Sequence, residues 1–401
     1  MDILSCDILS LQMKKEEKKI REYFSEKESI QNALLDYLDT ENANEEFFLE
    51  KISYLKERTN NKQAIQKNRQ ELKNFLFLLL NISNNHHRTP NFFSKVNNIL
   101  TYLSEIIKLT FSNYDLFQIF QSNKSILLFL ISQRIILLDE NILKEIFEEG
   151  PQETPKYCHF FVPEIKRNLN DTEKVTRIEE EILKVNEHNF EDYEQKRLIG
   201  ENDSYISSLI RSDSINDFIE YISQFNISIS SEINQSIFET NQFLIDKKPT
   251  LIEYAGFFGS IQIFKYLLVN KATLTPSLWL YAIHSNNPEL IHLLEENNIK
   301  PDDATFEECF EESIKCHHNE LANYFENNYL NYNSEKENYN EKAISCIFKY
   351  SNYTFFPDNF IENFVFFYLC KYDYSEIVKH LLKSIENEIK YIDEIPTILF
   401  F

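Results

Sequence analysis

Glycine is nearly absent from the 401-residue sequence, which has only Gly150, Gly200, Gly256 and Gly259. Sandwiches and barrels of many short strands need glycine in their turns, so this scarcity argues against an all-β fold. The glycine-rich phosphate loops of dinucleotide-binding and P-loop folds are missing as well. The sequence therefore predicts an all-α protein without a nucleotide site of the usual kind.

Basic residues are also few: 41 lysines and arginines stand against 64 aspartates and glutamates, which gives a net charge of −23. A protein of this charge repels phosphate backbones and anionic lipid surfaces. We therefore expect no nucleic acid among its partners.

Cysteines are few and scattered, and long hydrophobic runs are missing. The six cysteines form no dense framework, and the first residues lack a basic region followed by an apolar core. Both features are typical of a protein of the cytoplasm, an intracellular and reducing compartment. The longest apolar stretches, Phe75–Leu80 and Ile126–Ile131, are far shorter than the ~20 residues that a membrane span requires. We expect no membrane span.

The sequence does contain helical periodicity. Within residues 1–150 apolar side chains recur three and four apart, for example at Leu34, Leu35 and Leu38, and Asn44 and Pro90 mark helix starts. Prolines and Gly150 interrupt the pattern near residues 148–170. We predict an N-terminal helical region over 1–150, a break and a charged connecting helix over 151–199 that Asp171 or Thr172 caps, and a repeat stack over 200–401.

The repeat stack is predicted from five windows that share one pattern. They cover residues 210–222, 251–268, 278–294, 312–325 and 369–382. In each window a short helical segment ends at a Gly, Asn, Ser, Asp or similar turn residue, and a second apolar helix follows. Such a pair cannot bury its apolar face alone, so copies stack in an array.

The second window resembles an ankyrin repeat. Thr250, Leu251, Ala255, Gly259, Ile263, Leu267 and Leu268 match the ankyrin pattern, in which Thr250 would cap the first helix and Gly259 would form the turn. Residues 196–205, 209–214, 277–290 and 312–320 together resemble a greatly expanded ankyrin-repeat family of a parasitic flagellate protist, with an associated domain of unknown function. The resemblance implies an α-solenoid that recognises other proteins and implies no established activity.

Three groups of histidines and cysteines could carry chemistry, and each of them also has a structural explanation. Cys309, Cys316, His317 and His318 form the strongest metal candidate, but their spacing does not fit a zinc site, and polar residues at helix ends explain them better. The adjacent Cys158 and His159 are poorly placed to act as nucleophile and base. The pair His86–His87 lies among asparagines before Pro90 and is interpreted as a loop. We predict no metal site, no cofactor and no catalytic residues.

Two further features concern surfaces. The acidic residues 302, 303, 307, 308, 311 and 312 lack the spacing of a calcium loop, and we interpret them as a solvated ridge or as a contact for a basic partner. Trp279, the only tryptophan, is expected in the core of a repeat. The sequence as a whole predicts a non-catalytic scaffold for protein–protein interaction. The alternatives are a self-associating structural component and an enzyme with an unrecognised site.

Overall fold

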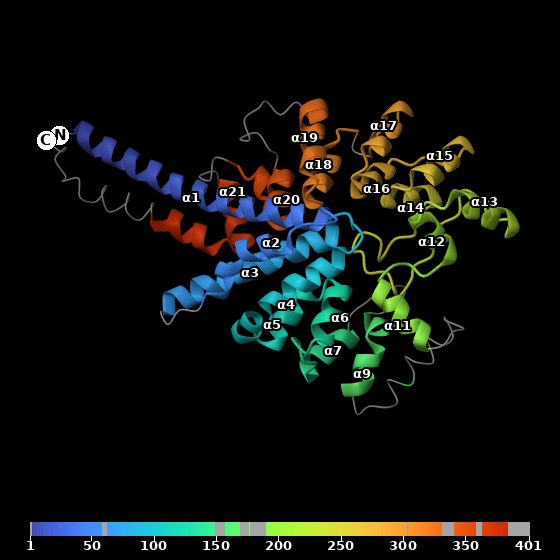
Figure 1. The fold of residues 1–401 in the computed structure, drawn as a ribbon. Coiled ribbons are helices and arrows are strands. Elements are labelled where there is room, and N and C mark those ends of the chain that lie inside the picture. The colour runs from blue at the N-terminus through green and yellow to red at the C-terminus, as the bar shows by residue number, and fades with distance from the viewer. Residues whose placement is uncertain are drawn as a thin grey trace.

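The fold was derived from a computed structural model, which describes residues 2–57, 62–148, 157–168, 176, 190–302, 304–330, 341–357 and 363–383. These residues are almost entirely helical, and the only β-type pairing among them is an isolated bridge between Glu232 and Thr250 (Figure 1). The predicted all-α class is therefore confirmed. Among the described residues, none of the helices combines the length and the apolar character that crossing a bilayer requires.

The first half is an array of helices that begins with the long α1. Its elements are α1 (Asp2–Asp39), α2 (Glu45–Lys51), η1 (Ser53–Lys56), α3 (Lys62–Asn85), α4 (Phe92–Thr110), α5 (Asn113–Phe120), α6 (Lys124–Ser132) and α7 (Glu140–Glu148). Local sequence explains several starts. Asn44 caps α2 as predicted, and Ser112 and Asp115 form a reciprocal capping box at α5.

Part of the predicted break after residue 148 is helical. Residues 157–168 form the short helices α8 (Tyr157–Phe160) and α9 (Val162–Asn168), because Phe160, Phe161 and Ile165 bury their side chains in the core. Helix α11 (Phe190–Ile199) then leads into the second half. The predicted caps Asp171 and Thr172 lie outside the described residues.

The second half consists of paired helices. The pairs are α12 (Tyr205–Arg211) with α13 (Ile215–Gln224), α14 (Leu251–Phe258) with α15 (Ile261–Val269), α16 (Leu278–Ser285) with α17 (Pro288–Glu296), and α18 (Glu307–Lys315) with α19 (Asn319–Phe325). A π-helical turn η2 (Glu326–Leu330), α20 (Glu341–Tyr350), the 3-10 helix η4 (Tyr353–Phe355) and α21 (Asn363–Lys371) follow, and residues 375–383 are also helical.

The turns after the first helices share one backbone feature. A residue with positive φ lies after α12, α14, α16, α18, α20 and α21, at Asp213, Gly259, Asn286, His317, Ser351 and Asp373 respectively. Glycine, asparagine and aspartate enter this left-handed region at the least cost. The turn after α20 belongs to none of the five sequence windows, so the regular pattern extends beyond what the residues alone indicated.

The first helices pack against one another in chain order. Contacts run from α12 to α14, from α14 to α16, from α16 to α18 and from α18 to α20, so each pair buries its apolar side against the next. In Figure 1 these pairs follow an arc from the right, over the top, to the centre of the molecule. Trp279 of α16 is fully buried in this stack, as predicted, and its indole N–H donates to the carbonyl of Ile299 at 2.9 Å.

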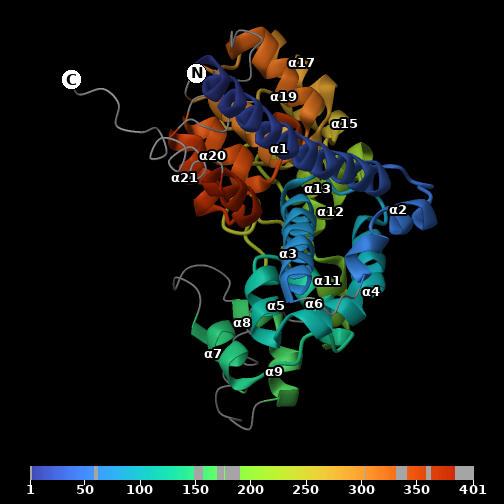
Figure 2. The same ribbon diagram turned by 90° about the vertical axis from the view of Figure 1, so that its left-hand side faces the viewer.

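The two halves of the chain pack together. Helix α1 lies against η4, and Figure 2 shows it running diagonally across the molecule, with α3 and α20–α21 below it in this view. The side-chain amide of the buried Gln31 of α1 donates to the side chains of Asn352 and Thr354. Its oxygen, Oε1, accepts from the backbone N–H of Tyr353 at 2.7 Å. Phe24 of α1 contacts the rings of Tyr353, Phe356 and Tyr374 in the same region.

A non-helical segment between α13 and α14 lies over the first helices of the stack. The ring of Phe243 in this segment contacts Phe257 of α14 and both Tyr281 and His284 of α16. This segment covers part of α14 and α16, so the second helices, α13, α15, α17 and α19, offer the more open surface.

Candidate functional site

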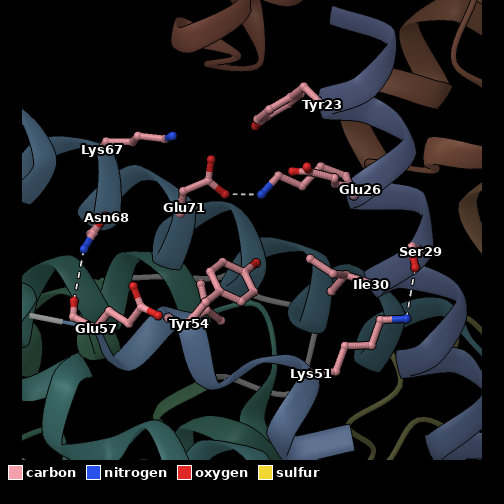
Figure 3. A pocket seen from close by; sticks show the side chains of 12 residues that line it. Tyr23, Glu26, Ser29, Ile30, Lys51, Tyr54, Glu57, Lys67, Asn68 and Glu71 are labelled. Carbon is pink, nitrogen blue, oxygen red and sulfur yellow. Dashed lines mark hydrogen bonds and ion pairs between the residues drawn. The ribbon is translucent and has the colours of Figure 1, made fainter. Parts of the chain in front are cut away.

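The first candidate site is a pocket of about 530 Å³ between α1, η1 and α3. Figure 3 shows side chains from these elements around it: Tyr23, Glu26, Ser29 and Ile30 of α1, Lys51, Tyr54 and Glu57 from the α2–η1 region, and Lys67, Asn68 and Glu71 of α3. The lining contains carboxylates and ammonium groups in equal measure, and neither histidine nor cysteine is part of it.

Interactions within the chain engage several of the charged groups of this pocket. Lys27 forms an ion pair with Glu71, Lys51 donates to Ser29 at 2.9 Å, and Asn68 donates to the carbonyl of Glu57 at 3.0 Å (Figure 3). Burial raises the pKa of Tyr23 and of Tyr54, so both phenols stay protonated near neutral pH. These interactions give several of the lining side chains a structural role.

The second candidate site is a groove of about 390 Å³ between α17 and α19, the second helices of adjacent pairs. Its floor includes the buried Ile291 and the half-buried Leu321. Its rim is polar, with Glu295, Glu320 and Tyr324 among the lining residues. The phenol of Tyr324 donates to Glu295 at 2.5 Å, which fixes one side of the groove.

The third candidate site is a cluster of histidines where the two halves meet. His86 and His87 follow the end of α3, and His318 lies at the turn between α18 and α19. One nitrogen from each ring lies within 4.8 Å of the others. A carboxylate oxygen of Asp39, the last residue of α1, lies 2.9 Å from His86 Nε2 and 3.6 Å from His87 Nε2.

Backbone carbonyls orient two of these rings. His86 Nδ1 lies 2.7 Å from the carbonyl oxygen of Cys316, and His318 Nδ1 lies 2.8 Å from that of Ile283. A carbonyl oxygen can only accept, so Nδ1 must carry the proton in both rings and Nε2 points into the cluster. Burial lowers the pKa of His87 to about 4 and that of His318 well below its ordinary value, so both rings are neutral near pH 7.

Beside the histidine cluster lies a second polar group, formed by His284, Glu312, Lys315 and Cys316. Glu312 accepts from His284 Nε2 at 2.6 Å and from Lys315 at 2.8 Å. Burial alone would raise the pKa of Glu312, but the hydrogen bond from His284 and the charge of Lys315 outweigh it and lower that pKa to about 2. Because burial also lowers the pKa of His284, the imidazole is neutral and Lys315 balances the carboxylate charge.

This group is not arranged as a nucleophile and base. Cys316 Sγ lies 3.5 Å from Nδ1 and 3.7 Å from Nε2 of His284, and these nearly equal distances mean that the sulfur is not in line with the lone pair of Nδ1. The thiol is completely buried, and burial raises its pKa well above the ordinary value. Such a thiol is inert, because the thiolate is the reactive form.

The structure separates the four residues of the strongest metal candidate in the sequence. His318 joins His86 and His87, and Cys316 joins His284 and Glu312, whereas Cys309 belongs to neither group. His317 supplies the left-handed turn after α18, and neither of its buried ring nitrogens makes a well-formed hydrogen bond. The loop assignment of His86 and His87 is confirmed, but their proximity to His318 was missed. Residues 231 positions apart carry no local signal of contact.

The remaining residues singled out in the sequence lie as follows. Cys158 is buried on α8, where it packs in the core. Of the acidic cluster, Asp302 and Glu308 are exposed, Glu307 and Glu311 are half-buried, and Glu312 is bound by His284 and Lys315. Asp303 lies outside the described residues. The cluster is therefore only in part the solvated ridge that we expected.

The described residues define an all-helical protein built from an N-terminal array and a series of stacked helical pairs. No family model matches the chain, and neither a curated protein nor a solved structure matches it. The ankyrin resemblance therefore remains a prediction that is carried by the residues quoted for it.

Proposed function

We propose that this chain is a non-catalytic scaffold for protein–protein interaction, in which ankyrin-like helical pairs form an α-solenoid. The observation that carries the proposal is the consecutive packing of α12, α14, α16, α18 and α20, which leaves the second helices as an outer layer. Stacks of this kind present an extended surface rather than a single deep cleft.

Details of the second pair support the ankyrin-like reading. Thr250 and Glu253 form a capping box at α14, and Gly259 ends that helix with a φ of 70°. Glu253 stands where the ankyrin pattern has a histidine. Its carboxylate also accepts from Thr275 at 2.8 Å and from Ser277 at 2.6 Å, both just before α16. The residue that departs from the pattern thus links one pair to the next.

The groove between α17 and α19 is the surface that best suits a partner. It has an apolar floor and a polar rim, the arrangement that protein interfaces favour. Glu295 and Glu320 line it, and the exposed Glu296 lies beside it on α17. Because these carboxylates belong to a strongly acidic protein, we propose a segment rich in lysine and arginine as the occupant.

Selection of peptides from a random display library on the immobilised full-length chain tests this function. We expect the enriched peptides to carry excess lysine and arginine and to bind in a salt-dependent manner. Fluorescence anisotropy with one enriched peptide then compares Glu320→Lys, which reverses a charge in the groove, with Glu220→Lys, which reverses an exposed charge on α13. The first variant should weaken binding about tenfold or more, and the second should change it by less than about twofold.

Three outcomes would contradict this function or its location. The selection could enrich no peptide above background, or the enriched peptides could lack basic residues. Equal weakening by Glu320→Lys and Glu220→Lys would show that overall charge, and not the groove, attracts the peptide.

A further inference from the structure

Three segments that are distant in sequence bring metal-binding side chains to one point. Asp39 ends α1, His86 and His87 follow α3, and His318 begins α19. The ring centroids of His86 and His87 are 4.3 Å apart, and those of His86 and His318 are 4.8 Å apart. Nothing in the proposed binding of a partner protein uses this junction, which lies where the two halves of the chain meet.

The hydrogen bonds around the cluster turn one nitrogen of each ring towards the other two rings. The carbonyls of Cys316 and Ile283 hold the Nδ1 protons of His86 and His318. Metal-binding histidines commonly donate their second N–H to a carbonyl in this way, which fixes the tautomer and the ring orientation. His86 Nε2 faces the Asp39 carboxylate at 2.9 Å, and His318 Nε2 faces His87 Nδ1 at 3.1 Å.

We propose that His86, His87 and His318, with the carboxylate of Asp39 beside them, form a binding site for one divalent transition-metal ion of the zinc type, which joins the two halves of the chain. Tetrahedral zinc with bonds of about 2.0–2.1 Å holds neighbouring ligand atoms roughly 3.3 Å apart. In the cluster, His87 Nδ1 and His318 Nε2 are 3.1 Å apart, and one nitrogen from each of the three imidazole rings lies within 4.8 Å of the others. Small side-chain shifts would bring these nitrogens to the separations that zinc requires. Three imidazoles and one carboxylate suit zinc and its neighbours better than magnesium or calcium.

The site has a route to solvent. His86 and His318 are buried, but 25% of the His87 side chain and 37% of the Asp39 side chain are exposed. An ion can therefore enter from the side of these two residues without unfolding of the junction.

The neighbouring group of His284, Glu312 and Cys316 is the less suitable of the two. The ammonium group of Lys315 lies 2.8 Å from Glu312 and repels a cation there. At the histidine cluster the nearby Lys95 donates instead to the backbone carbonyls of Leu38 at 3.0 Å and Thr40 at 2.7 Å. The electrostatic balance therefore favours the histidine cluster.

Titration of the full-length, chelator-treated chain with Zn²⁺ and with Co²⁺ tests the site. We expect one equivalent of Zn²⁺ to bind, and Co²⁺ to give the strong visible d–d absorption of a tetrahedral ion. The variants Asp39→Asn and His87→Asn change the accessible carboxylate and the accessible imidazole of the site and should weaken Zn²⁺ binding about 100-fold. His292→Asn is the matched control, since His292 lies beside Glu295 and Glu296 with 68% of its side chain exposed. This control should bind Zn²⁺ as the unaltered chain does.

Several results would overturn the metal site. These are the lack of saturable Zn²⁺ binding by the unaltered chain, or binding that Asp39→Asn and His87→Asn leave unchanged while circular dichroism shows them folded. A cobalt–thiolate charge-transfer band would place the ion at Cys316 and would also contradict the proposal. Peptide binding is measured separately at the α17–α19 groove, so failure of this site and failure of the proposed scaffold function are distinguishable.

Discussion

Glu312 keeps its negative charge in a largely buried position because of two partners. His284 on α16 donates a neutral hydrogen bond, and Lys315 on the same helix as Glu312 supplies the opposite charge. A buried carboxylate with such partners favours the folded state only while it is ionised. The pair of helices α16 and α18 is therefore held together by an interaction that acid can remove.

The pKa of Glu312 gives a prediction for acid stability. Its pKa is about 2 in the folded chain against an ordinary value of 4.5, so the unfolded chain binds more protons between these values. The stabilisation is complete above pH 4.5 and is lost as the pH falls towards 2, by about 3 kcal/mol in total. We expect Glu312→Gln to flatten this part of the stability–pH profile, measured by urea unfolding at a series of pH values.

The control for this prediction is Glu296→Gln, which alters an exposed glutamate on α17. It should leave the profile unchanged. A Glu312→Gln variant whose stability still falls between pH 4.5 and 2 as steeply as that of the unaltered chain would refute the assignment.

At the scale of single elements, α14 contains Gly256 and ends at Gly259, and the two glycines occupy different backbone conformations. Gly259 has a φ of 70°, whereas Gly256 lies within the helix, and a Cβ there would meet Phe264, Leu278 and Tyr281 no closer than 3.6 Å. An L-residue in the left-handed region costs about 1–2 kcal/mol. Alanine inside a helix gains up to about 1 kcal/mol over glycine.

We therefore predict changes of opposite sign at these two positions. Gly259→Ala should lower the free energy of unfolding by about 1–2 kcal/mol. Gly256→Ala should leave it unchanged or raise it by up to about 1 kcal/mol. Equilibrium urea unfolding, followed by the fluorescence of Trp279, measures both. A loss of similar size for both variants would mean that packing, and not the backbone conformation, decides the outcome at residue 259.

The elements that sequence predicted well are those with local signals. The cap at Thr250, the turn at Gly259, the cap at Asn44 and the buried Trp279 follow from neighbours in the chain. The pairing of α20 with the rest of the stack was missed, since η4 replaces the second helix of a pair. The short helices at 157–168 were missed because prolines and a glycine suggested a break, although their aromatic residues could bury.

The histidine cluster could not be predicted for a different physical reason. No spacing rule connects His87 with His318, because the contact exists only after the first array has packed against the stack. Sequence spacing identifies metal ligands when they lie within one turn or one hairpin. Here Asp39, His86 and His318 come from three elements, and only the tertiary structure places them together.

At the scale of the whole molecule, Gln31 connects the first array with the last elements. It is completely buried, and its side-chain oxygen accepts a hydrogen bond from the backbone N–H of Tyr353. Removal of one partner leaves a buried donor without an acceptor, which costs more than the loss of an exposed hydrogen bond. If the two halves unfold as one unit, a change in α1 must lower the stability of the helical pairs in the second half as well.

We predict that Gln31→Ala lowers the free energy of unfolding by about 2–3 kcal/mol, as reported by Trp279. Trp279 is the only tryptophan and lies in α16, far along the chain from the altered residue. Gln118→Ala, on the exposed face of α5, should change the same transition by less than about 0.5 kcal/mol. A Trp279 transition that does not respond to Gln31→Ala would show that the two halves unfold independently.

The contact between Gln31 and Asn352 spans 321 residues of chain. A ribosome adds about 5–20 residues each second, so α1 emerges roughly 15–65 s before the segment that covers it exists. During that time Phe24 and its neighbours have no native surface to meet, and the nascent chain is open to association with other chains. We therefore expect slow translation or a shortage of chaperones to reduce the yield of folded chains. The stability of the chains that do fold should stay the same.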